Sequence, residues 1–112
     1  IVVDDLNTTN VAELGSAINL NRAFPQGCNA GFAEITDRQN IRLRVFERGA
    51  AETSACGSGA CAAMSILRRA NLVDQTVNVT QKGGDLTIAW TGGADSVIMT
   101  GPATHVYEGI FV

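Results

Sequence analysis

A helix with almost no polar side constrains the fold of this chain more than any other feature of its sequence. From about Gly57 to Ala70 nearly every residue is apolar or small, and the first strong charges are Arg68 and Arg69. A helix that is apolar all round is buried all round. The rest of the chain shows short, half-buried strand patterns. We therefore expect an α+β fold in which a curved, mostly antiparallel sheet wraps around a central apolar helix.

Strand patterns and turn residues alternate along the rest of the chain. The segment 41–46 is the clearest, because Ile41, Leu43 and Val45 alternate with Arg42 and Arg44, which is typical of a strand with one buried and one wet face. Turn residues at 37–40, 83–84 and 92–93 separate the strands. We expect strands over residues 1–3, 33–36, 41–46, 77–80, 86–90, 96–100 and 105–112.

A second, shorter helix is expected near the start of the chain. Asn10 is a favourable residue for a helix N-cap. Behind it, Val11, Leu14 and Ile18 recur at the spacing of one helix face. This helix should therefore place one apolar face against the sheet.

Length, composition and charge agree with one small domain over residues 1–112. The apolar fraction is 46% and the net charge is −3, so the chain has no basic field that would attract nucleic acid or an anionic membrane. No apolar run approaches the ~20 residues of a membrane span, and no signal peptide precedes Ile1. An odd number of cysteines, three, favours free thiols in a reducing cytoplasm. No cluster of His, Cys and carboxylate residues has the spacing of a metal site.

The start of the apolar helix carries the candidate chemistry. Cys56 stands directly before Gly57-Ser58-Gly59, where backbone N–H groups have no partner within the helix and the dipole adds positive charge. Gly57 and Gly59 leave those N–H groups open to a carboxylate or phosphate. The same field stabilises a thiolate. A thiol beside an anion seat suggests chemistry on a carbon next to a carboxylate.

Residues 47–63, with Glu47-Arg48-Gly49, Glu52-Thr53 and the run from Ala55 to Ala63, resemble the second cysteine motif of the diaminopimelate epimerase family. Three further segments resemble that family in the same order. They are Asp4-Asp5, Phe24-Pro25 leading to Asn29-Ala30-Gly31-Phe32, and Met99-Thr100-Gly101-Pro102-Ala103 leading to Val106-Tyr107-Glu108-Gly109. Family members consist of two similar halves that face each other across a cleft and give one catalytic cysteine each. This chain resembles the C-terminal half only.

The resemblance implies a two-base epimerisation of LL-diaminopimelate to the meso form, in lysine and peptidoglycan precursor synthesis, without pyridoxal phosphate or any other cofactor. Cys56 would be one catalytic base, and Glu47 would hydrogen-bond toward the thiols and polar substrate groups. Arg48 and Asn29 would bind the distal carboxylate of the substrate. Gly57 and Ser58 would bind the reacting α-carboxylate through their N–H groups. The single lysine, Lys82, precedes a Gly-Gly turn, which is a poor place for a Schiff base.

The partners implied are diaminopimelate and the N-terminal half of the same enzyme. Without that half the isolated chain is expected to be inactive, and whether the complete enzyme forms a homodimer stays open. Cys28 and Cys61 are interpreted as incidental and as packing, and His105 as a surface residue. Three alternatives remain: another cofactor-independent racemase, such as one acting on proline, an inactive anion-binding domain, and a redox protein that uses Cys56 and Cys61.

Overall fold

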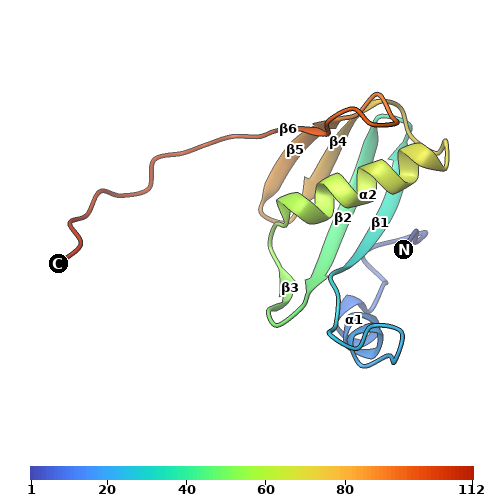
Figure 1. The fold of residues 1–112 in the computed structure, drawn as a ribbon, viewed down its shortest axis with the longest axis horizontal. Coiled ribbons are helices and arrows are strands. Elements are labelled where there is room, and N and C mark those ends of the chain that lie inside the picture. Colours follow the sequence, from blue (N-terminus) through green and yellow to red (C-terminus); the bar gives the residue numbers. More distant parts are fainter.

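The computed structural model describes residues 1–112 and contains two helices and six strands (Figure 1). Their order along the chain is α1 (Val11–Asn19), β1 (Ala30–Asp37), β2 (Asn40–Glu47), β3 (Ala51–Thr53), α2 (Gly57–Arg69), β4 (Thr76–Gln81), β5 (Gly84–Ala89) and β6 (Ile98–Thr100).

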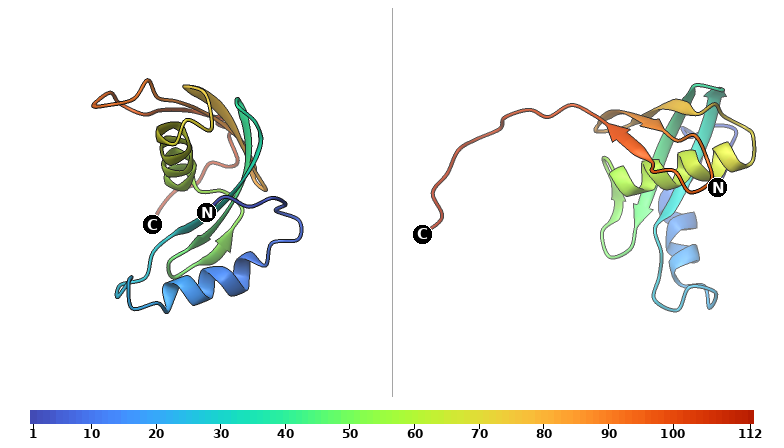
Figure 2. Two further views of the ribbon diagram at one scale, coloured as in Figure 1. Left: turned by 90° about the vertical axis from the view of Figure 1, so that its right-hand side faces the viewer. Right: turned by 45° about the horizontal axis from the view of Figure 1, so that its top comes forward.

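All six strands form one sheet. The order is β1-β2-β4-β5-β6, and the short β3 pairs with β2. Every pairing between these strands is antiparallel except β2 with β4, because the chain leaves β2, passes through β3 and α2, and returns in the same direction. The sheet curves, and α2 lies in its concave face (Figure 2). The predicted α+β architecture, a curved and mostly antiparallel sheet with an apolar helix against it, is confirmed.

The main core lies between α2 and the concave face of the sheet. The predicted alternation of β2 is confirmed, since Ile41, Leu43 and Val45 are buried there while Arg42 and Arg44 point to the other face. Arg44 forms a bidentate ion pair with Glu52, with distances of 2.6 and 2.8 Å from the guanidinium nitrogens to the carboxylate oxygens. Three buried residues of α2 complete this core: Ala60, Met64 and Leu67.

A smaller core lies on the opposite face of β1 and β2, where α1 packs. Asn10 caps α1 as predicted, because its Oδ1 accepts a hydrogen bond from the Glu13 N–H (3.3 Å). Val11 is buried against Phe32, but Leu14 is exposed, contrary to the predicted apolar face. Gly15 instead lies close against the sheet, since a Cβ at this residue would lie 2.3 Å from Cγ of Phe46.

The expectation that the central helix is buried all round is wrong. The sheet covers one side of α2, whereas the opposite side carries Ala62 and Ile66, and Ile66 is 62% exposed. The reason is geometric: a sheet of this width curves over one side of the helix only. Neither α1 nor α2 has the length and hydrophobicity that a membrane-spanning helix requires.

The two ends of the chain also differ from expectation. Val2 forms a single parallel bridge with Ala33 in place of a strand over residues 1–3. The strand expected over residues 105–112 is absent, and the chain beyond β6 extends away from the sheet (Figure 1). Its apolar side chains, such as Phe111, are fully exposed. An extended segment becomes a strand only when it has a neighbour to pair with, and this one has none here.

Candidate active site

Cys56 is the N-cap residue of α2. Its backbone is extended (φ −142°, ψ 106°), and the residue is 7% exposed. The Gly59 N–H donates a hydrogen bond to Sγ of Cys56 (3.3 Å), and Oγ of Ser58 lies 3.5 Å from the same sulfur. The thiol therefore sits at the positive end of the helix, as the sequence predicts.

The first two backbone N–H groups of α2, which precede the Gly59 N–H, are free. The Ala60 N–H donates to the Cys56 carbonyl (3.0 Å), but the N–H groups of Gly57 and Ser58 have no hydrogen-bond partner. The first turn of α2 contains no acidic side chain that would offset the helix dipole. This end of the helix can accept an anionic group next to the thiol.

The residues expected to bind the distal end of a substrate lie at the ends of β1 and β2. Asn29 stands directly before β1, and its Oδ1 accepts a hydrogen bond from the Arg48 N–H (2.8 Å). The Arg48 guanidinium donates to the carbonyl of Gln26 (3.4 Å) and forms no ion pair. Both side chains are exposed. The structure thus brings Asn29 and Arg48 together and leaves the guanidinium free to bind a carboxylate.

Glu47 ends β2, one residue before Arg48. Its Oε1 accepts a short hydrogen bond from the Thr53 hydroxyl, across the pairing of β2 with β3. No hydrogen bond joins the Glu47 carboxylate to the Cys56 thiol. A Cβ at Gly59 would lie 3.0 Å from Val45 and 3.1 Å from the Cys56 sulfur, so the start of α2 rests on β2 two residues before Glu47.

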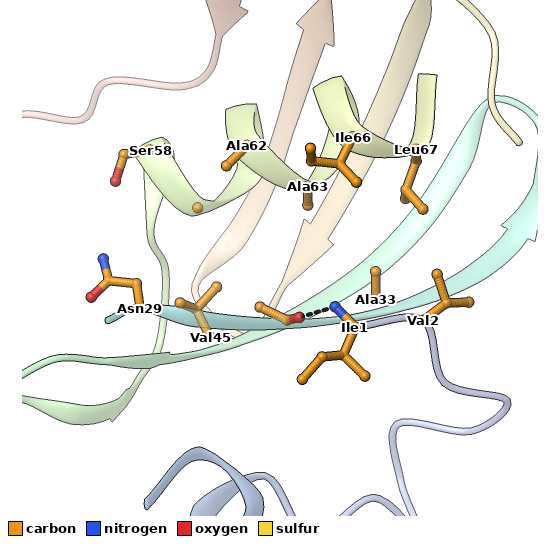
Figure 3. Close-up of a pocket in the computed structure, with 12 residues that line it drawn as sticks. Ile1, Val2, Asn29, Ala33, Val45, Ser58, Ala62, Ala63, Ile66 and Leu67 are labelled. Carbon is orange, nitrogen blue, oxygen red and sulfur yellow. Dashed lines mark hydrogen bonds between the residues drawn. The ribbon is translucent and has the colours of Figure 1, made fainter. Parts of the chain in front are cut away.

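A groove of about 410 Å³ runs between α2 and β1 (Figure 3). Asn29, Ser58 and Gly59 line one end of it, and the other nine lining residues include Gly31 and eight apolar side chains. Asn29 and Ser58 lie on opposite sides of this polar end, whereas Leu67 and Val2 lie at the far end (Figure 3). Cys56, Glu47 and Arg48 are not part of the lining. Asn29 and Ser58 supply the polar side chains of the lining, and both lie at this end.

The other two cysteines are also free thiols. Cys61 lies in the second turn of α2 and is half-buried, and burial raises the pKa of its thiol. Cys28 is half-buried beside Asn29, with its backbone N–H and carbonyl both bonded to the amide of Asn19 (3.1 and 2.9 Å). Neither thiol has the helix-terminus environment of Cys56. His105 is exposed, as expected of a surface residue.

Two residues that support the site were not predicted from the sequence. Thr53 bonds the Glu47 carboxylate, and Gln81 bonds the backbone of Cys56. A signal for Gln81 was present, because it follows Val77 and Val79 at the two-residue spacing of one strand face and so belongs to the buried side. Thr53 belongs to the motif segment Glu52-Thr53, but nothing in the sequence indicated its contact with Glu47, because that contact depends on the short strand β3.

Comparison with known sequences supports the motif resemblance. The sequence model of the family described as diaminopimelate epimerase matches residues 1–106. A diaminopimelate epimerase of Ralstonia nicotianae is 57% identical over 108 residues, which cover 96% of this chain and 37% of that relative. One from Coxiella burnetii is 50% identical over 109 residues, covering 97% of this chain and 40% of the relative. The chain thus spans well under half the length of these curated relatives.

Solved structures with low sequence identity share the fold. A phenazine biosynthesis protein of the PhzF family from Enterococcus faecalis superimposes with a TM-score of 0.61 at 18% identity, covering 80% of this chain and 32% of that one. A PhzF-family protein from Bacillus anthracis gives a TM-score of 0.57 at 22% identity, covering 79% and 28%. At these identities the likeness concerns the fold alone. On the family match and the high identity to its curated members, the chain belongs to the diaminopimelate epimerase family.

Proposed function

We propose that this chain supplies one face of a cofactor-independent diaminopimelate epimerase, with Cys56 as one of its two catalytic bases. The observation that carries the proposal is the position of the Cys56 thiol at the N-terminus of α2, beside the two unpaired N–H groups of Gly57 and Ser58. The name of the relatives, diaminopimelate epimerase, supports diaminopimelate as the substrate. The proposed reaction converts its LL form to the meso form. The reaction belongs to lysine and peptidoglycan precursor synthesis in the cytoplasm, where thiols stay reduced.

The chemistry is an exchange of one proton at the α-carbon. The Cys56 thiolate removes the α-proton and becomes a thiol, and the electron pair left on carbon spreads into the α-carboxylate. A thiol on the opposite face, supplied by the N-terminal half, delivers a proton and becomes a thiolate, so the configuration inverts; the reverse reaction exchanges the two roles. The N–H groups of Gly57 and Ser58 stabilise the charge that develops on the carboxylate. Cysteine suits both roles because thiol and thiolate are both accessible near neutral pH.

The distal end of the substrate would bind at the ends of β1 and β2. The unpaired guanidinium of Arg48 can meet a carboxylate with two parallel hydrogen bonds, which lysine cannot do. Asn29 already orients the Arg48 backbone and lines the polar end of the groove. Glu47, held by Thr53, would accept hydrogen bonds from ammonium groups of the substrate. These contacts would select a diamino diacid over a smaller amino acid.

The test is exchange of the α-proton of LL-diaminopimelate in heavy water, followed by NMR. We expect no exchange with the chain alone, and exchange when it is combined with the N-terminal half of the enzyme. Cys56→Ser should lower the rate at least about 100-fold, the usual contribution of a general base. The matched control is Cys28→Ser, which removes another free thiol of the chain and should leave the rate unchanged.

Other outcomes would replace the proposal. Unchanged turnover in Cys56→Ser would remove Cys56 from the mechanism. Binding of diaminopimelate by calorimetry without exchange, in a combined sample shown to be folded and associated, would favour an anion-binding domain. Faster exchange with proline than with diaminopimelate would indicate a different racemase. A reversible bond between Cys56 and Cys61, detected by mass spectrometry, would favour a redox protein.

A further inference from the structure

Gln81 is the single buried residue of the chain with a polar side chain, and it is 7% exposed. It ends β4 on the face that carries Val77 and Val79, so the strand's alternation directs its amide into the core toward the start of α2. Burying an amide is unfavourable unless it is hydrogen-bonded. The buried amide of Gln81 therefore requires a hydrogen-bond partner.

That partner is the peptide backbone of Cys56. Oε1 of Gln81 accepts a hydrogen bond from the Cys56 N–H (2.8 Å), and Nε2 of Gln81 lies 3.5 Å from the Cys56 carbonyl oxygen. The side-chain amide of Gln81 thus faces both the backbone N–H and the backbone carbonyl of Cys56. Since the Cys56 N–H precedes the helix, no helical carbonyl could otherwise accept it.

The turn that follows Gln81 holds the preceding residues as well. The Gly83 N–H donates to the Ser54 carbonyl (2.7 Å). A Cβ at Gly83 would lie 3.1 Å from that oxygen and 3.2 Å from Cβ of Ala55, so the turn and residues 54–56 are in close contact. The β4–β5 hairpin, remote in sequence, therefore anchors the segment that carries the thiol at two points.

From this geometry we infer that Gln81 is a positioning residue for the Cys56 thiol. It touches neither substrate nor thiol, but it holds the Cys56 backbone in the extended conformation that puts Sγ 3.3 Å from the Gly59 nitrogen. Without this anchor the N-cap residue could rotate, and the thiol would leave the helix terminus. The catalytic importance of this role rests on the proposed function, whereas the positioning itself does not.

The first test needs no activity. In Gln81→Met, which keeps the length of the side chain and removes the amide, we expect the amide protons of Cys56 and Gly59 to exchange with solvent at least about tenfold faster by NMR. The amides of Val77 and Val79 should keep their protection. Gln75→Met, an exposed glutamine next to the same strand, is the matched control and should change nothing.

Gln81→Glu provides rescue, because it retains an acceptor of the same length for the Cys56 N–H. It should keep the Gly59 protection within about threefold of the wild type, and it also tests the inference if Gln81→Met does not fold. Either of two results in Gln81→Met would overturn the inference: unchanged protection of the Gly59 amide, or an equal loss at every amide of the sheet, which would mean a general loss of stability. Equal losses of Gly59 protection in the Glu and Met variants would also overturn it.

The second test uses α-proton exchange with the N-terminal half present. Gln81→Met should lower kcat at least about tenfold and leave KM within about twofold, because the substrate contacts at Asn29 and Arg48 are unaltered. An altered KM with unchanged kcat would contradict positioning of the base. If the wild type shows no exchange but the amide result holds, the proposed function fails and the positioning role stands.

Discussion

Cys56 combines two roles that usually belong to different residues. The residues preferred at a helix N-cap are Ser, Thr, Asp and Asn, whose oxygen accepts an N–H of the first turn. Here a sulfur takes that place at Gly59. A cysteine that caps its own helix holds its reactive atom against the helix dipole without a separate charged partner. Serine preserves the cap, which is why Cys56→Ser is a cleaner test of chemistry than alanine.

Glu47 depends in a similar way on Thr53. Thr53→Val keeps the shape of the side chain and removes the hydroxyl that bonds Oε1 of Glu47, so the carboxylate would lose its one side-chain partner. We expect the free energy of unfolding to fall by about 1 kcal/mol, the usual net value of such a bond. Turnover of the combined enzyme should also fall. Both quantities are measurable by urea denaturation and α-proton exchange.

The control is Thr80→Val, at an exposed threonine of β4, which should leave both quantities unchanged. Full turnover in Thr53→Val would show that the orientation of Glu47 does not matter for the reaction.

At the level of residues, the sequence predicted what local patterns determine. The position of Cys56 at the start of a helix follows from the local sequence Cys-Gly-Ser-Gly, and the structure confirms this position. The contacts of Gln81 and Thr53 join segments that no local pattern connects, through the turn of one hairpin and the register of β3. The meeting of Asn29 with Arg48 needed the resemblance, because 19 residues separate them.

At the level of elements, the contact between α1 and the sheet is set by Gly15. In an exposed helix a change from glycine to alanine would stabilise by about 1 kcal/mol. Here the new Cβ would lie 2.3–2.6 Å from Phe46 side-chain atoms. We expect Gly15→Ala to destabilise the chain by about 1–3 kcal/mol in urea denaturation, as overpacking does.

Ser16→Ala, on the exposed side of the same helix, controls for helix propensity and should not destabilise. In the double variant Gly15→Ala with Phe46→Ala, the loss should be less than the sum of the two single losses, because the contacts with the Phe46 ring are gone and only the one with its Cβ remains. Strict additivity would mean that α1 shifts to accommodate the methyl group.

The strands with strong alternation were predicted correctly. The two wrong expectations, full burial of α2 and a strand in the tail after β6, have the same cause. Strands β1, β2, β4 and β5 all occur where their patterns indicate, with ends that differ by up to three residues. The apolar character of α2 and of the tail after β6 was equally clear. Apolar residues indicate that a segment tends to be buried, but they do not indicate which other segment buries it. Within residues 1–112 the sheet covers one side of α2 and none of the tail.

Across the whole molecule, acid should weaken the fold. The Arg44 guanidinium lowers the pKa of Glu52 below its ordinary 4.5, and the Arg38 guanidinium lowers the pKa of Asp74 below 3.8. The unfolded chain therefore binds these protons more readily than the folded one. Their stabilisation is complete above about pH 5.5 and is lost as the pH falls through the lowered values. The urea midpoint should decrease accordingly between pH 6 and pH 3.

Glu52→Gln removes one of these titrations and should flatten that dependence. Asp85→Asn, at an exposed carboxylate without an ion pair, is the matched control and should leave the slope as it is. Equal slopes in the wild type and Glu52→Gln would show that the pair with Arg44 does not contribute.

The single parallel pairing has a consequence for how the chain assembles. The hairpins β1–β2 and β4–β5 each form from neighbouring residues, but only three residue pairs join β2 to β4, and Asn40 and Asn78 in one of them are 38 residues apart. Local contacts form quickly, whereas distant ones wait on closure of the loop between them. We therefore expect the two hairpins to form early in folding, and the junction between them, which α2 crosses, to form late. Gln81, which bonds the Cys56 backbone, belongs to the second hairpin. We therefore expect the Cys56 thiol to reach its final environment only in this last step.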